Sequence, residues 1–425
     1  VDYAVRTLMM IRRGSISYRY SKNLTLPGFA GTSKWFGQST LMGSTAPGVD
    51  FSLGFFDKDF VSKALDRGWL ISNDTVINPA TFATTKEFEA RLNLEPLPGL
   101  KIDLAQKWFQ MGQTSMEFMY KGMPTTYTGG FHMSYIAIGT FFKSSGNATN
   151  GFNSEIYRKF KSNRAEVTRL IEQKYAGQRY PNSGFMEGNV LAGATYDSKN
   201  GSVNPNSADV LIPAFLAAYG GHSVSGNKLG LFPSLLQSLP NWRISFDGLS
   251  TIPIVAKYLK SLTLNHAYNC DYTIAAYTSY SNWASNGSMG FIKDVTTGNP
   301  IPSSQYNIGS VTLTEAFMPL IGVDAALKNS LSTRLMYNTQ RNLSLNITSA
   351  QIMEILSKEW VVGFGYMIKD FNLILKMKNK QAKVKNDLTL RCDFSVRDTK
   401  SLMRNIESDN VQPTDGGTTT TIKVS

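Results

Sequence analysis

The sequence predicts an all-β fold, an antiparallel up-and-down sheet of the transmembrane β-barrel type with small helical inserts. Apolar and polar residues alternate in many segments, which is typical of strands with one apolar and one polar face. Several segments reach ten residues or more, and a tilted strand needs about 9–11 residues to cross a bilayer. The longest apolar run, 210–219, has ten residues and contains Pro213, so it is too short for a membrane-spanning helix.

The composition excludes several classes of protein. Of the 425 residues, 17% are charged and 12% are aromatic, which argues against a disordered chain and against a long coiled coil. The formal net charge of +12 is compatible with nucleic acid, with anionic lipid or lipopolysaccharide, and with acidic polypeptides. The sequence contains no zinc finger, recognition helix or aromatic RNA-binding motif, so nucleic acid is not expected as a partner.

Strands are predicted along most of the chain. The alternation is clearest over 262–274 and 388–396. Turn residues at 95–99 predict a hairpin, and Arg13-Gly14, Gly112-Gln113 and Lys369-Asp370 are interpreted as shorter reversals. The other predicted strands are 5–13, 15–20, 88–95, 100–110, 115–121, 131–142, 242–247, 311–323, 331–340, 343–348, 359–368, 372–378 and 418–424.

Two helices interrupt the strand pattern. Over 152–175 apolar residues recur mostly every four positions among basic ones, which predicts an amphipathic basic helix or a pair of helices. A second helix is predicted over 207–219, with Ser207 as its cap. The insert that contains both, 150–235, is expected in a barrel lumen or in a loop. Segments 182–205 and 283–304 are rich in Gly, Asn, Ser and Pro and are predicted to be contact loops.

No catalytic, cofactor-binding or metal-binding residue is predicted, because no group of titratable side chains converges in the sequence, and an enzyme is not expected. The histidines, His132, His222 and His266, lie far apart, and His266 is interpreted as structural because it lies on the apolar side of a strand. Cys270 and Cys392 cannot form a disulfide framework or a four-cysteine zinc site and are expected to act as small hydrophobes.

Two surface features leave alternatives open. A lysine cluster lies between the last two long strands and is either a solvated hairpin rim or a contact for lipid phosphates. Its members are Lys376, Lys378, Lys380, Lys383 and Lys385. Aromatic residues at strand ends suit either the interfacial girdle of a membrane barrel or the core of a soluble sandwich. These are Trp108, Phe109, Phe141, Phe142, Trp360 and Tyr366.

Several segments together resemble the C-terminal part of the SprA (Sov) family, the outer-membrane translocons of type IX secretion in Bacteroidetes. The most specific stretch is VLIPAFLAAY at 210–219, followed by LPNWR at 239–243, FDGL at 246–249 and LTLNHAY at 262–268. The others are VRTLM, ISY and LPGF within 5–29, FHMSYI at 131–136, RNLSL at 341–345, SKEWVVGFGY at 357–366 and LTLRCDFSVRD at 388–398. Their order matches the family over nearly the whole chain.

The resemblance implies a wall segment of a very large barrel that passes folded proteins across the outer membrane, in protein secretion and gliding motility. The implied partners are outer-membrane lipid and lipopolysaccharide, a PorV-like barrel, a periplasmic plug protein, and cargo proteins with the type IX C-terminal signal. The chain has no signal-peptide pattern and opens in a predicted strand, so residues 1–425 are expected to be a piece of that barrel with two open edges.

Two other functions stay open at this stage. A different outer-membrane barrel, such as a porin or a TonB-dependent receptor, would be a self-contained closed sheet. A soluble β-rich adhesin would have shorter strands, and their apolar faces would turn inward to a core. The chemistry of the two strand faces therefore distinguishes a membrane wall from a soluble protein.

Overall fold

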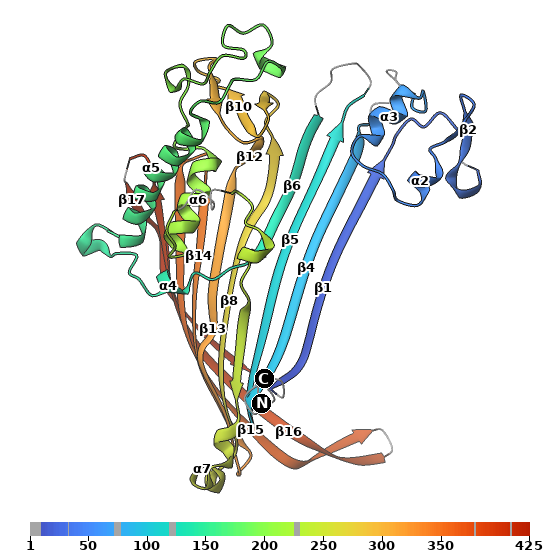
Figure 1. Cartoon of the computed structure of the whole chain (residues 1–425). Helices are drawn as coiled ribbons and strands as arrows, with labels where there is room; N and C mark the ends of the chain where they lie inside the picture. Colours follow the sequence, from blue (N-terminus) through green and yellow to red (C-terminus); the bar gives the residue numbers. More distant parts are fainter. Residues whose placement is uncertain are drawn as a thin grey trace, which may run out of the picture.

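The computed structural model describes residues 10–32, 34–71, 78–118, 125–224, 230–377, 380–408 and 410–425, with the backbone alone over 372–385. Parts of two predicted strands, 5–9 and 119–121, lie outside the described residues, and so does Lys378. The largest unit of the fold is one twelve-stranded sheet whose long strands twist along their length (Figure 1).

The main sheet is antiparallel, and its strands follow one another in chain order, which confirms the all-β up-and-down prediction. The order is β1-β4-β5-β6-β8-β13-β14-β15-β16-β17, with β7 between β5 and β8 and with β12 paired to β8. The strands are β1 Ile11–Thr25, β4 Ala80–Leu97, β5 Leu100–Met116, β6 Thr125–Ser134, β7 Asn241–Phe246, β8 Leu259–Ser279, β12 Tyr306–Ile308, β13 Ser310–Leu327, β14 Leu331–Asn346, β15 Gln351–Met377, β16 Lys380–Asn405 and β17 Val411–Val424.

The predicted hairpin at 95–99 is confirmed, because Leu97 pairs with Leu100. The three shorter reversals are wrong. Gly14 lies within β1, and Gly112 lies within β5, where it pairs with Gly129 of β6. A Cβ on Gly129 would come within 2.4 Å of the Tyr277 hydroxyl, so this position requires glycine. At Asp370 the chain forms a bulge with φ 56°, and β15 then continues to Met377.

β6 and β7 occupy one position in the sheet, between β5 and β8. β6 pairs with the half of β5 nearer Met116, and β7 pairs with the half nearer Leu100. The chain leaves the sheet after Ser134 and re-enters it at Asn241. We call residues 135–240 the insert. It includes the segment 150–235 that the sequence marked as an insert.

The insert contains the two predicted helices. α5 (Glu155–Tyr175) is one continuous helix, and the Ser154 hydroxyl caps it by accepting a hydrogen bond from the Tyr157 N–H. α6 (Ala208–Tyr219) is buried at every residue except Asp209, which is partly exposed. The predicted strand 131–142 is wrong beyond Ser134, because the chain turns there into α4 (Ile138–Phe141). Short 3₁₀ turns complete the insert at Ala148–Asn150, Gly184–Met186, Ser198–Asn200 and Leu235–Gln237.

Long connections gather at one end of the sheet, which we call the insert end; the opposite end is the turn end. At the insert end, 26–79 links β1 to β4 and 280–309 links β8 to β13 (Figure 1). The predicted loop 283–304 is instead a small sheet of β9 (Trp283–Asn286), β10 (Met289–Lys293) and β11 (Pro300–Pro302). The connection 26–79 holds η1 Trp35–Gly37, β2 Ser39–Leu41, β3 Ser44–Ala46, α2 Val49–Ser52 and α3 Phe60–Asp66. The turn end holds η7 Gly248–Thr251 and α7 Pro253–Tyr258.

The main hydrophobic core lies between the sheet and the insert. Tyr268, Phe317 and Leu343 on the strands pack with Phe160 of α5 and Phe215 of α6, and none of the five is more than 1% exposed. Figure 1 shows α5 and α6 lying over β13 and β14. Within the described part of the chain, the helices are too short or too polar to span a membrane.

Candidate functional site

The two faces of the main sheet differ in chemistry. Directly paired residues lie on the same face, so the register sorts the side chains. One row of paired residues runs across eight strands and is apolar throughout. It consists of Leu100, Phe246, Leu264, Val323, Leu335, Val362, Phe394 and Ile422. We call this side of the sheet the apolar face.

Next to that row, the opposite side carries a polar row. It consists of Thr263, Asp324, Arg334, Gly363, Asp393 and Lys423, again in direct register. We call this side the polar face. The alternation seen in the sequence at 262–274 and 388–396 therefore belongs to one continuous two-faced sheet.

The apolar face is covered by the insert toward the insert end and is open toward the turn end. Trp360 is 54% exposed, Phe364 53% and Ile422 67%. We call the open part the apolar belt. Its members are Ile16, Tyr18, Phe88, Leu92, Leu94, Leu100, Ile102, Leu104, Trp242, Ile244, Phe246, Leu262, Leu264, Ile321, Val323, Leu331, Leu335, Tyr337, Trp360, Val362, Phe364, Tyr366, Ile368, Leu388, Leu390, Phe394, Val396, Ile422 and Val424. A contiguous apolar surface of this extent marks a site that meets another apolar phase or partner.

Aromatic pairs form the edge of the belt nearest the insert end. Tyr18 pairs with Phe88, which pairs with Trp108. On β14, six strands away from β1, the edge lies at Tyr337. Its partner is Trp360 of β15, and the two ring centroids lie 4.6 Å apart. At the turn end the belt stops at short turns or charged residues.

The polar face carries a network of exposed ion pairs. Arg334 donates from Nε to Asp324 at 2.7 Å, and Asn265 donates to the other oxygen of that carboxylate at 2.8 Å. Arg397 pairs with Glu359 at 2.9 Å. Further pairs join Arg19 to Glu87 and Arg91 to Glu89. Such pairs contribute little stability individually, but together they make a hydrated charged surface.

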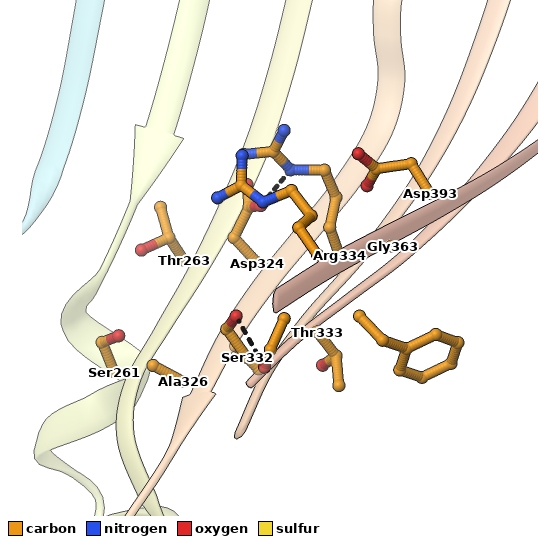
Figure 2. A pocket seen from close by; sticks show the side chains of 13 residues that line it. Ser261, Thr263, Asp324, Ala326, Ser332, Thr333, Arg334, Gly363 and Asp393 are labelled. Carbon is orange, nitrogen blue, oxygen red and sulfur yellow. Dashed lines mark hydrogen bonds and ion pairs between the residues drawn. The ribbon is translucent and has the colours of Figure 1, made fainter. Parts of the chain in front are cut away.

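A shallow depression on the polar face lies over two glycines of β15. Figure 2 shows Arg334 and Asp324 side by side, with Thr263 and Asp393 beside them. A Cβ on Gly363 would lie 2.4 Å from an Asp393 carboxylate oxygen. A Cβ on Gly365 would lie 2.5 Å from the Ser332 hydroxyl. The glycines therefore let polar side chains of the neighbouring strands lie across β15.

A buried ion pair on the apolar face holds the insert. Arg341 of β14 and Glu315 of β13 are 1% and 0% exposed and lie 2.6 Å apart. The Tyr268 hydroxyl donates to Glu315 at 2.6 Å. Arg341 also donates to the carbonyl and hydroxyl oxygens of Thr140, at 3.1 and 2.9 Å. Since Thr140 belongs to α4, one arginine joins the sheet to the insert.

A second arginine repeats this arrangement. Arg404 of β16 donates to the carbonyl oxygens of Phe152 and Ser145, at 2.8 and 2.6 Å, and lies 3.6 Å from Glu354. Lys400 donates to the Gly146 carbonyl. Three cations of the sheet, Arg341, Lys400 and Arg404, thus hold the segment of the insert that precedes α5.

On the far side of the insert, a buried carboxylate joins α6 to the 280–309 connection. Asp209 accepts hydrogen bonds from the Ser304 N–H at 2.9 Å and the Ser303 hydroxyl at 3.5 Å. Burial raises the pKa of Asp209, and these hydrogen bonds and the charge of Lys174 only partly oppose the rise.

Asp209→Asn is expected to gain stability relative to wild type as the pH rises from 3.5 to 7. Below about pH 3.9, the ordinary aspartate pKa, the carboxyl is neutral in the folded and unfolded chains. Above it, the unfolded chain ionises first, so the free energy of unfolding falls until the pH passes the raised folded pKa. Urea-dependent proteolysis of the insert at both pH values measures the change. A stability difference that is independent of pH would contradict the assignment.

The residues singled out in the sequence lie at separate places. His266 Nδ1 lies 2.7 Å from the Leu320 carbonyl oxygen, and since that oxygen can only accept, Nδ1 is the donor. This contact supports the structural interpretation of His266. His132 lies 3.0 Å from the Thr273 hydroxyl, and the His222 ring lies 6.2 Å from that of Tyr135.

Both cysteines lie on the apolar face, Cys270 under the insert and Cys392 exposed between the belt residues Phe364 and Val424. Of the aromatic residues at strand ends, some lie in a core and others are exposed, as an interfacial girdle requires. Trp108 and Phe141 pack on the core under the insert, whereas Trp360 and Tyr366 are exposed. Four lysines of the cluster fall on the β15–β16 hairpin at the turn end, where only the backbone is described, namely Lys376, Lys380, Lys383 and Lys385.

The buried charges Glu315, Arg341, Glu354 and Arg404 were missed in the sequence. A signal was present: these charges interrupt the apolar side of an alternating strand, as Glu315 does between Leu313 and Phe317. A charge at such a position requires a buried partner. The alternation alone could not name that partner, because the contacts at Thr140, Ser145 and Phe152 come from the distant insert.

Among the residues that the structure describes, no group of histidine, cysteine and acidic side chains could hold a metal ion. Comparison with models of protein families gives no match to this chain. Comparison with curated proteins gives none either. The two-faced sheet and its insert are therefore the basis for any functional assignment.

Proposed function

We propose that the chain is a wall segment of a large outer-membrane β-barrel, the translocon of type IX secretion. The observation that carries the proposal is the exposed apolar belt, backed on the other side of the same strands by a charged polar face. The belt would meet lipid, and the polar face would line a water-filled passage. The resemblance of the sequence to the SprA family supports the choice of translocon among barrels.

The slope of the belt supports a membrane location. A row of direct partners joins Tyr18 to Leu343 over six strand steps, yet the aromatic edge on β14 is Tyr337, six residues away. Steps of about 4.8 Å across the strands and about 3.4 Å along them give a tilt of about 35°. Strands of transmembrane barrels tilt by about 35–45°. The belt therefore follows the line that a flat membrane would mark on a barrel wall.

The height of the belt supports the same conclusion. On β15 it extends from Trp360 to Ile368, nine residues along the strand. At about 3.3 Å per residue and a tilt near 35°, this corresponds to about 25 Å, the height of the apolar band of outer-membrane barrels. A soluble adhesin would need to bury this surface, so the belt argues against that alternative.

The polar face suits the passage of folded proteins. Its ion pairs keep charges of both signs in water, and a hydrated surface offers passing cargo little apolar area to adhere to. β1 and β17, as described, each pair on one side only, so further strands would be needed to complete the wall. A PorV-like barrel, a plug protein and cargo with the type IX signal remain the partners that the resemblance implies.

The insert shares the apolar face with the belt. In the proposed barrel it therefore lies on the outer side of the wall, beyond the membrane edge, and not in the lumen. The long connections at the insert end and the short turns at the other end match the extracellular loops and periplasmic turns of outer-membrane barrels. We assign the insert end to the cell exterior on this basis.

The size and location of the native polypeptide test the proposal. An antibody raised against 152–175 would be used to blot fractionated cell envelopes. We expect a band far above 47 kDa in the outer-membrane fraction. A band near 47 kDa in the outer membrane would favour a self-contained barrel, and a band in the soluble fraction would overturn the membrane assignment.

A further inference from the structure

The insert carries uncovered apolar side chains on its side toward the turn end. α4 lies there, beside β13 (Figure 1). Phe141 is buried against Phe317, but the next residue, Phe142, is 64% exposed although its ring lies 5.5 Å from that of Phe317. Ile138, at the start of α4, is also exposed. Phe317 precedes the first belt residue of β13, Ile321, by four positions. The exposed corner of α4 is therefore adjacent to the edge of the belt.

Lysines lie along the same edge. On the apolar face, Lys358 precedes Trp360 by two residues, and Lys86 precedes Phe88 in the same way. Both lysines are exposed, and neither forms an ion pair or hydrogen bond in the structure as described. β4 and β15 both run toward the turn end, so Lys358 lies just outside the aromatic edge, and Lys86 lies outside Phe88 and beside the exposed Tyr20 of β1.

The insert adds another cation at this level. Lys143 directly follows Phe142, and its Nζ lies 3.1 Å from the exposed Glu155 carboxylate. Three residues later, the Gly146 carbonyl accepts a hydrogen bond from Lys400. Lys358 is close enough to Lys400 to act on it electrostatically. Lys143 of the insert and Lys358 of the wall thus belong to one cationic margin.

We propose that this margin of Ile138, Phe142, Lys143, Lys358 and Lys86 rests on the lipopolysaccharide leaflet. The two apolar side chains would lie at the level of the interface, and the lysines would bind lipopolysaccharide phosphate groups. Aromatic residues at the interface with lysines just beyond them suit a phosphorylated surface. The proposal rests on the proposed function, and it commits to lipopolysaccharide because the insert end is assigned to the cell exterior.

Photo-crosslinking in cells that produce the whole protein tests the placement. Phe142→p-benzoylphenylalanine keeps the phenyl ring and adds a photoreactive benzoyl group at the margin, where Phe142 is 64% exposed and leaves room for it. Phe364→p-benzoylphenylalanine probes the belt, and Val190→p-benzoylphenylalanine probes an insert residue that is 98% exposed. After irradiation, an adduct that reacts with antibody to lipopolysaccharide is expected at 142. At 190 we expect none, and at 364 we expect adducts to lipid of either kind.

The outcomes separate this inference from the proposed function. Adducts at 364 without a lipopolysaccharide adduct at 142 would overturn the inference and leave the membrane wall standing. No lipid adduct at either position would overturn the wall itself. A phospholipid adduct alone at 142, or equal lipopolysaccharide adducts at 142 and 190, would overturn the assignment of the margin.

A charge test examines the lysines separately. In the Phe142→p-benzoylphenylalanine background, Lys143→Gln with Lys358→Gln should lower the lipopolysaccharide adduct at least threefold. Lys143→Arg with Lys358→Arg should preserve it. Lys199→Gln, at an exposed lysine elsewhere in the insert, is the control and should leave it unchanged. Protease resistance of the insert verifies folding, and an unchanged yield in a resistant double variant would contradict phosphate binding.

Discussion

Leu335→Lys is expected to block assembly of the protein into the outer membrane. Leu335 lies in the row of eight paired apolar residues and is 44% exposed on the belt. A lysine near the middle of the bilayer destabilises a transmembrane barrel by about 2–4 kcal/mol. The direct partners of Leu335 are Val323 and Val362, so no carboxylate beside it on the same face could pair with the lysine. Folded, heat-modifiable protein in the outer membrane, measured by semi-native electrophoresis, should fall at least tenfold.

The next residue provides the matched control. Met336 lies on the same strand but points to the polar face, where it pairs with Gly322 and Val361. Met336→Lys adds the same charge to a surface that already carries Arg334 and Asp324, so assembly should stay within about twofold of wild type. Equal losses for both variants would indicate a general effect of charge on β14. Equal tolerance would mean that the belt does not meet lipid.

Local patterns were sufficient to predict the sheet. Alternation, strand length and the turn at 95–99 determine one strand and one hairpin at a time, and an up-and-down sheet is built from such units. The wrongly predicted reversals occurred where a local turn signal conflicts with the pairing to neighbouring strands. Gly112 resembles a turn residue, but it lies in mid-strand, where it pairs with Gly129 of β6.

The position of the insert could not be predicted from the same patterns. Nothing in the local sequence indicates that β6 and β7 complete one position in the sheet across 106 residues, because that pairing is non-local. Because the insert lies between β6 and β7, it covers the apolar face toward the insert end. Alternation identifies an apolar face but cannot say whether lipid, an insert or a second sheet covers it, so the belt was visible only in the structure.

Replacing the buried Arg341 is expected to release the insert from the sheet. Arg341→Met leaves Glu315 buried without its cation and removes both hydrogen bonds to Thr140. Breaking a buried pair in this way costs about 3–5 kcal/mol. The effect should appear as release of the insert, since α4 loses its main polar contact with β14. Cleavage of the insert by protease in graded urea, followed with the antibody against 152–175, measures it.

Arg334→Met is the matched control, because Arg334 lies on the same strand and pairs with Asp324 on the exposed polar face. Its loss should cost no more than about 1 kcal/mol. Combining Arg341→Met with Glu315→Leu removes the unpaired charge and should recover much of the stability of the single variant. Recovery would show that the pair matters because a lone buried charge is costly. If the double variant releases the insert as readily as Arg341→Met alone, the hydrogen bonds to Thr140 hold the insert and Glu315 serves only to keep Arg341 in place.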